Sequence, residues 1–93
     1  MKNVEITYQA TPNPESMKFL VGFAISSENL HFATAEEASR SPLAQKILNF
    51  PWASGVLIGS DFLSVSKHNW VEWRILADPL ADFIMEHSES GFP

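Results

Sequence analysis

The sequence predicts an α+β fold: a two-layer β-β-α-β-β-α domain with a largely antiparallel sheet and helices packed on one face. Three observations favour this fold. Three runs alternate apolar and polar residues with the period of two that is typical of strands, and a short apolar run, Val56 to Ile58, predicts a fourth strand. Two further segments carry helix-start signals. The 93 residues are 45% hydrophobic and 12% aromatic, which suffices for one modest core, so we interpret residues 1–93 as a single domain.

The first two strands flank a corner that contains two prolines. Val4 to Ala10 alternates apolar and polar side chains and predicts a half-buried strand, and Met17 to Ile25 predicts the second one. Between them, Pro12 and Pro14 fix two φ angles and remove two backbone donors, while Asn13 can form an Asx turn. We interpret the corner as a rigid link that sets strand register, with a recognition surface as the alternative.

Helical structure is expected next. Leu30 to Phe32 is a short extended piece, and Thr34 followed by Glu37 fits a capping box that starts a helical turn. Ser41 is a suitable N-cap, and the helix that it begins should run from Pro42 to about Asn49, since proline is well tolerated at the first helical position.

A hairpin and a final helix complete the order of elements. Pro51 ends the first helix, and Val56 to Ile58 is predicted to be the third strand. Gly59-Ser60-Asp61 makes a tight turn into a fourth strand, Phe62 to Lys67. After Trp70 we expect a turn or short helix, and then a helix from Pro79 to about His87 with Asp78 as its cap. Apolar residues at helical spacing support this: Trp73, Ala77, Leu80, Ala81 and Ile84.

Composition excludes several classes of function. The formal net charge is −5 and the six Lys and Arg are scattered, so nucleic acid is an improbable partner. The chain has no cysteine, which removes thiolate nucleophiles and cysteine-ligated zinc or iron–sulfur clusters. No stretch approaches the length of a membrane span, and no apolar signal region precedes Val4. We therefore expect a cytoplasmic protein that does not bind membranes.

No catalytic or metal-binding motif is present. His31, His68 and His87 lack metal-ligand spacing, and we interpret them as solvated or capping residues. The serines lie in no nucleophile motif, and the closest acidic pairs fall at expected helix starts or exposed ends. Those pairs are Glu36 with Glu37, Asp78 with Asp82, and Glu86 with Glu89. We therefore predict no catalytic, cofactor-binding or metal-binding residues and a protein that is not an enzyme.

Glycines and tryptophans have structural interpretations with one exception. Gly55 and Gly59 are expected to be turn and packing residues. Trp73 falls on the apolar side of the last helix and should pack in the core. Trp52 and Trp70 lie in connecting segments, where core packing competes with a protein-binding role.

Several motifs resemble one family. Thr11 to Phe19 reads TPNPESMKF and is similar to the TPNPxSxKF pattern that opens the amino-terminal domain of NifU-like (Nfu-type) iron–sulfur cluster scaffold and carrier proteins. Ser41 to Ala44, the segment from Gly59 to Lys67, a following tryptophan and the Ser90 to Pro93 ending continue the resemblance in the same order. It covers essentially the whole chain.

The resemblance also has two gaps. Phe50-Pro51-Trp52-Ala53 stands where the family usually carries an I-x-G-V segment. In the family, moreover, the CxxC pair that binds the cluster belongs to a separate carboxy-terminal domain, which this sequence does not contain. We interpret the chain as an excised amino-terminal domain, with a standalone version as the alternative.

The resemblance implies a non-enzymatic accessory domain in iron–sulfur cluster assembly or delivery. Its expected partners are assembly or client proteins, including a cluster-bearing carboxy-terminal domain, and it binds no cofactor itself. We predict that a partner contacts a surface built from Asn13, Glu15, Ser16, Lys18, Asp61, Phe62 and Trp70. One alternative is a general peptide-binding module that uses an exposed sheet edge and is unrelated to iron. Another is a small hydrolase that pairs His31 or His68 with a carboxylate.

Overall fold

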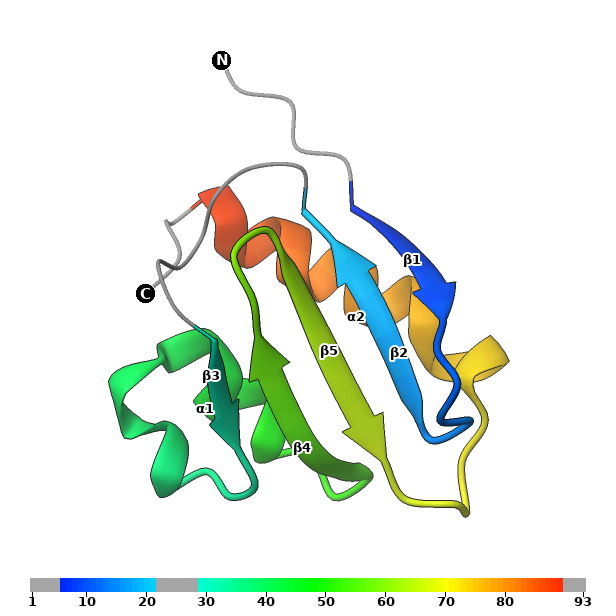
Figure 1. The fold of residues 1–93 in the computed structure, drawn as a ribbon, viewed down its shortest axis with the longest axis horizontal. Helices are drawn as coiled ribbons and strands as arrows, with labels where there is room; N and C mark the ends of the chain where they lie inside the picture. Colours follow the sequence, from blue (N-terminus) through cyan, green and yellow to red (C-terminus); the bar gives the residue numbers. More distant parts are fainter. Residues whose placement is uncertain (1–5, 22–28, 90–93) are drawn as a thin grey trace.

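The computed structural model describes residues 6–21 and 29–89. In this part of the chain a five-stranded antiparallel sheet has the order β1-β2-β5-β4-β3, and helices α1 and α2 cover one of its faces (Figure 1). The α+β fold and the position of the helices are thereby confirmed. The elements are β1 (Thr7–Ala10), β2 (Ser16–Leu20), β3 (Leu30–Phe32), the 3-10 helix η1 (Glu37–Arg40), α1 (Pro42–Leu48), β4 (Ala53–Ile58), β5 (Phe62–Lys67) and α2 (Trp73–Glu89).

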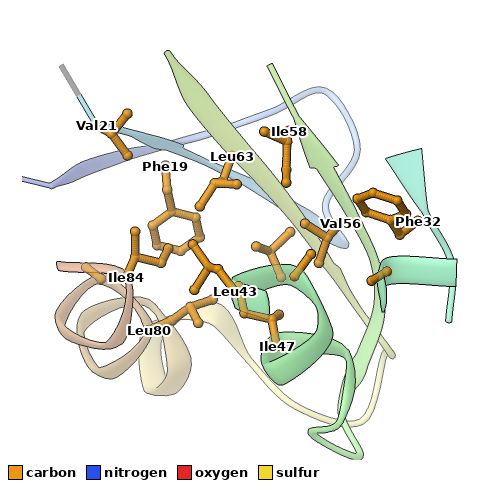
Figure 2. Packing of buried hydrophobic residues seen from close by; sticks show 14 residues of the cluster. Phe19, Val21, Phe32, Leu43, Ile47, Val56, Ile58, Leu63, Leu80 and Ile84 are labelled. Atoms are coloured by element: carbon orange, nitrogen blue, oxygen red, sulfur yellow. The ribbon is translucent and has the colours of Figure 1, made fainter. Parts of the chain in front are cut away.

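The core lies between the helices and the central strands. Figure 2 shows Phe19 of β2 and Leu63 of β5 pointing toward Leu43 of α1 and Ile84 of α2. These four side chains are at most 1% exposed. Because successive residues of a strand face opposite sides, their neighbours Lys18 and Phe62 lie on the face that no helix covers.

The side chains that were predicted to cap the two helical segments form hydrogen bonds to nearby backbone amides. The Thr34 hydroxyl accepts a hydrogen bond from the Glu37 amide at 3.1 Å, and the Glu37 carboxylate accepts one from the Ala33 amide at 2.8 Å. The carboxylate thus reaches one residue further back than in a standard capping box. At α1, Ser41 accepts from the Ala44 amide at 3.3 Å with Pro42 as the first helical residue. The predicted N-cap of α1 is confirmed, whereas η1 itself begins at Glu37 with Glu36 as its N-cap, three residues after Thr34.

The predicted hairpin is present, but its first strand starts earlier. β4 begins at Ala53, three residues before the predicted Val56. The pairing passes from Ala53 opposite Lys67 to Gly55 opposite Ser66, so one extra residue is accommodated as a bulge. The prediction rested on the three consecutive apolar residues Val56 to Ile58, which do not reveal a bulge before them, and this explains the late predicted start.

The predicted break at Asp78-Pro79 is wrong. α2 runs without interruption through Pro79, and Asp78 is not its N-cap. Proline in a helix interior removes one hydrogen bond and costs about 3 kcal/mol. Here the cost is offset by burial on both sides of the proline, since Ala77, Leu80 and Ile84 are at most 4% exposed.

The first two predicted strands differ from the observed ones in extent and burial. β1 is exposed along its whole length because it is an edge strand, so the half-buried strand predicted there is wrong for Thr7–Ala10. β2 begins at Ser16, one residue early. Residues 4–5 and 22–25, which were also assigned to these strands, lie outside the described residues.

Tyr8 connects the edge strand β1 to α2. Its hydroxyl donates a hydrogen bond to Asp78 Oδ1 at 2.6 Å, and its ring lies 5.7 Å from that of Phe19. The hydrogen bond to Asp78 is the main cause that raises the pKa of Tyr8 above its usual 10.0. The folded state therefore holds the phenolic proton more tightly than the unfolded state does.

This bond predicts a pH-dependent loss of stability. Its contribution should be fully present below pH 10.0 and be lost as the pH rises through the raised folded pKa of Tyr8. We expect wild type to be more stable than Tyr8→Phe near neutral pH, and the difference to vanish in alkaline solution. Urea unfolding of both proteins across this pH range checks it. A difference that stays constant with pH would contradict the bond.

Candidate functional site

The Thr11–Ser16 corner satisfies its own polar groups. The Thr11 hydroxyl donates to the Asn13 carbonyl at 2.8 Å and accepts from the Asn13 amide at 3.1 Å. Asn13 Oδ1 accepts from the Glu15 amide at 3.0 Å, which is the predicted Asx turn. These bonds make the corner rigid without an external partner.

The same corner is bound to the end of β5. The hydroxyls of Ser16 and Ser66 share a hydrogen bond at 2.7 Å, and the Lys67 amide donates to the Glu15 carbonyl at 2.8 Å. Lys67 is only 7% exposed, and its ammonium group lies 3.2 Å from Glu15 Oε2 and 3.3 Å from the His68 carbonyl oxygen. The Glu15 carboxylate therefore compensates a buried charge.

Removing that carboxylate should destabilise the fold. We expect Glu15→Ala to lower the free energy of unfolding by about 1 to 2 kcal/mol, between the values for exposed and buried pairs, because Glu15 keeps part of its exposure. The matched control is Glu36→Ala, an exposed glutamate that makes no ion pair with a described residue. Urea unfolding measures both. Equal midpoints for the two variants would show that Lys67 does not need its partner.

A second group of predicted residues lies at the opposite end of the β2–β5 pair. Lys18 Nζ sits 4.5 Å from the centre of the Phe62 ring, a cation–π distance. That ring lies against Gly59, where an added Cβ would come within 2.1 Å of it, so a larger residue at this position would displace the Phe62 ring. The Asp61 carbonyl accepts from the Val21 amide at 3.1 Å.

The seven predicted partner-binding residues do not gather at one point. Register places Ser16 opposite Ser66 and Leu20 opposite Phe62, so the two ends are four residues apart, about 13 Å along the strand. Asn13, Glu15 and Ser16 form the corner, Lys18, Asp61 and Phe62 form the other group, and Trp70 stands apart in the β5–α2 connection with 63% of its surface exposed. Their role in binding stays a prediction.

An apolar groove that was not predicted from the sequence lies between the α1–β4 connection and α2. It encloses about 290 Å³ and is lined by Phe50, Trp52, Leu76, Pro79, Leu80 and Phe83. The Phe50 ring stacks on Trp52 at 5.3 Å and meets Phe83 edge-on at 5.6 Å. Phe50 and Trp52 belong to the segment that departs from the family pattern. That departure was the one feature of the sequence that could have indicated the groove.

Trp73 joins this groove to the core. Its indole meets Trp52 edge-on at 6.4 Å on one side and Phe19 at 6.1 Å on the other, so the predicted core position of Trp73 is confirmed. Its Nε1 is buried and has no hydrogen-bond partner among the described residues. The aromatic rings therefore form a continuous contact path from the core to the protein surface.

The described residues offer little to catalysis or metal binding. They contain no group of three or more His, Asp or Glu that could hold a metal ion. His31 and His68 are exposed, and neither hydrogen-bonds to a carboxylate within residues 6–21 and 29–89, so the geometry does not favour the hydrolase alternative. The His87 side chain lies outside the described part. No helix in that part has the length and apolar character to cross a membrane.

The fold and this site define a small α+β domain with one sheet face that no described helix covers and with an aromatic groove beside α2. The sequence model of the family described as "Scaffold protein Nfu/NifU N terminal" matches residues 6–91. The chain belongs to this family of iron–sulfur cluster scaffold proteins.

Named relatives agree with this assignment. The chain is 36% identical over 94 residues to the mitochondrial NFU1 iron–sulfur cluster scaffold homolog of Drosophila ananassae, a match that covers 99% of this chain and 33% of the relative. The corresponding human protein is 36% identical over 90 residues, which is 95% of this chain and 35% of that protein. The chain thus spans about a third of the length of these relatives.

Solved structures share the fold. The solution structure of a NifU-like protein from Saccharomyces cerevisiae superposes with a TM-score of 0.80 at 27% identity, covering 95% of this chain and 81% of that one. The crystal structure of protein SAV1430 from Staphylococcus aureus has a TM-score of 0.71 at 19% identity, covering 86% and 98%, and shows the fold alone.

The comparisons overturn the predicted cytoplasmic location. The relatives are named mitochondrial, which points to the mitochondrion. The prediction was wrong because it rested on a missing apolar signal region, and only secretory signals have one, whereas mitochondrial transit peptides are amphipathic and arginine-rich.

Proposed function

We propose that this chain is a non-enzymatic accessory domain in iron–sulfur cluster assembly or delivery that acts through contacts with other proteins. The observation that carries the proposal is the lack of any cysteine in a member of a cluster scaffold family. Clusters are held chiefly by cysteine thiolates, so a thiol-free member contributes protein surface while thiols elsewhere bind the iron.

The surface of the described part supports a contact role. Trp70 is 63% exposed, Ile75 59% and Phe50 36%, and aromatic side chains are enriched in the contact surfaces between proteins relative to the rest of the surface. Partners in cluster traffic follow from the family, and the relatives' names point to the mitochondrion as the place where they meet. The expected partners are assembly or client proteins, including a cluster-bearing carboxy-terminal domain.

A second candidate function rests on the sheet edge. β1 is exposed along its length and pairs only with β2 among the described strands, so its outer edge could accept an extended peptide as an added strand. This candidate needs no iron–sulfur partner. It predicts that amides of Thr7–Ala10 respond to the ligand, which separates it from the first proposal.

Titration of the isotope-labelled chain with a purified cluster-bearing carboxy-terminal domain of a relative tests the first proposal. We expect amide shifts that saturate at a defined stoichiometry, while the β1 amides stay unchanged. The absence of any shift with cluster-loaded and cluster-free domain, and with its client protein, would contradict an accessory role. Shifts confined to β1 would favour the second candidate.

A further inference from the structure

We propose that the groove lined by Phe50, Trp52, Leu76, Pro79, Leu80 and Phe83 docks a basic amphipathic segment of a partner protein. The inference rests on the proposed function and deepens it, because it names the contact surface and the chemistry of the partner. None of the seven residues predicted from the sequence lines this groove.

The walls of the groove are apolar and held in place. Phe50 is fixed between Trp52 and Phe83 by ring contacts at 5.3 and 5.6 Å, and Leu80 is 3% exposed and belongs to the core. A groove built by one rigid helix and a braced aromatic loop is preorganised, which reduces the entropy lost on binding. Aromatic side chains at such positions are typical anchors of protein interfaces.

The rim of the groove is negatively charged. Asp82 and Glu86 follow Pro79 and Phe83 by three residues, so they lie beside the groove on the surface of α2. Both are exposed, and neither forms an ion pair with a described residue, whereas Glu72 is paired with Arg74. α2 as a whole contains one arginine and four acidic residues, a formal net charge of −3.

Pro79 adds a backbone acceptor to this rim. Proline has no N–H, so the carbonyl of Ile75 loses the donor that a regular helix would provide. Ile75 is 59% exposed. A lysine or arginine of a bound segment could donate to this oxygen, and the same residue would be attracted by Asp82 and Glu86.

Charge selects among the possible occupants. A second copy of the chain would bring another acidic surface and a net charge of −5 against this rim, which disfavours self-association. An acidic or neutral partner would leave both carboxylates unpaired beside the interface. A helix with apolar residues at i, i+3, i+4 and i+7 and lysine or arginine on its flanks matches the groove and the rim together.

The test uses two synthetic helical peptides with the same leucine stripe, one with lysine and one with glutamate at every flanking position. The isotope-labelled chain is titrated with each. We expect only the lysine peptide to bind, with shifts at Phe50, Leu76 and Phe83 and with affinity that falls as salt is raised. Equal binding of the two peptides, shifts elsewhere, or no binding of either would overturn the inference.

Matched variants locate the interaction. Phe50→Ala removes one wall and Glu86→Lys reverses one rim charge, and each should weaken the lysine peptide by about tenfold. Glu36→Lys, an exposed site outside the groove with the same change in net charge, should leave the affinity unchanged. An equal loss in this control would overturn the groove as the site, as would a chain dimer whose contacts map to it.

The two proposals fail separately. If the chain binds the cluster-bearing domain and Phe50→Ala and Glu86→Lys leave that affinity unchanged, the accessory function stands and the groove inference is overturned. If the lysine peptide binds in the groove but no cluster-bearing domain or client does, the groove stands as a docking site and the iron–sulfur role falls.

Discussion

Replacing Phe19 by alanine should lower the free energy of unfolding by about 3 to 5 kcal/mol. Phe19 of β2 is fully buried, and the centre of its ring lies 5.7 Å from that of Tyr8 and 6.1 Å from that of Trp73. The substitution would remove the transfer free energy of the ring and leave a cavity between the sheet and α2. Since small domains are stable by only about 5 to 15 kcal/mol, a large part of the stability should be lost.

Urea unfolding measures this loss, and Phe50→Ala is the matched control. Phe50 is the same residue type but is 36% exposed, in a connection at the surface. Its truncation should cost clearly less than that of Phe19, on the order of 1 kcal/mol. Similar losses in the free energy of unfolding at the two positions would mean that the packing of Phe19 between β2 and α2 is not the centre of the core.

Replacing Pro79 by alanine should have a large effect of the opposite sign. The substitution restores the donor for the Ile75 carbonyl and replaces the worst helix former by the best, which should stabilise α2 by about 1 to 3 kcal/mol. For a chain of 93 residues, each kcal/mol corresponds to a rise in Tm of about 4 to 8 °C. Thermal unfolding followed by circular dichroism measures it.

Pro42→Ala is the control for this prediction. Pro42 is the first residue of α1, where proline costs no hydrogen bond and its φ angle suits the helix. Its replacement should therefore give no comparable gain and should slightly reduce stability through the unfolded chain. A Tm that falls in Pro79→Ala would show that the ring's packing in the groove outweighs the helical penalty.

Pro42 and Pro79 show which parts of the fold could be predicted from the sequence and which could not. The start of α1 was predictable because Ser41 and Pro42 act within a single turn, and the hairpin was predictable because Gly59 and the strands beside it are adjacent in sequence. The unbroken α2 was not, since the helix through Pro79 is stabilised by burial against strands that lie far away in the chain.

In the candidate site, too, contacts between neighbouring residues were predictable and contacts between distant residues were not. The Asx turn at Asn13 is local and was predicted, whereas the Glu15–Lys67 ion pair joins residues 52 positions apart and left no local signal. The groove needs Phe50 to meet Phe83, which only the packed fold brings about. Its one trace in the sequence was the pair of aromatic residues around Pro51.

Anaerobic reconstitution with ferrous iron and sulfide tests most directly the claim that this chain supports cluster traffic without binding the metal. The isotope-labelled chain is followed by NMR and by visible absorption, alone and then mixed with a cluster-bearing domain. We predict no stoichiometric iron and no cluster absorption for the chain alone, but saturable amide shifts in the mixture. Tight, stoichiometric iron binding with a defined spectrum by the isolated chain would contradict the account.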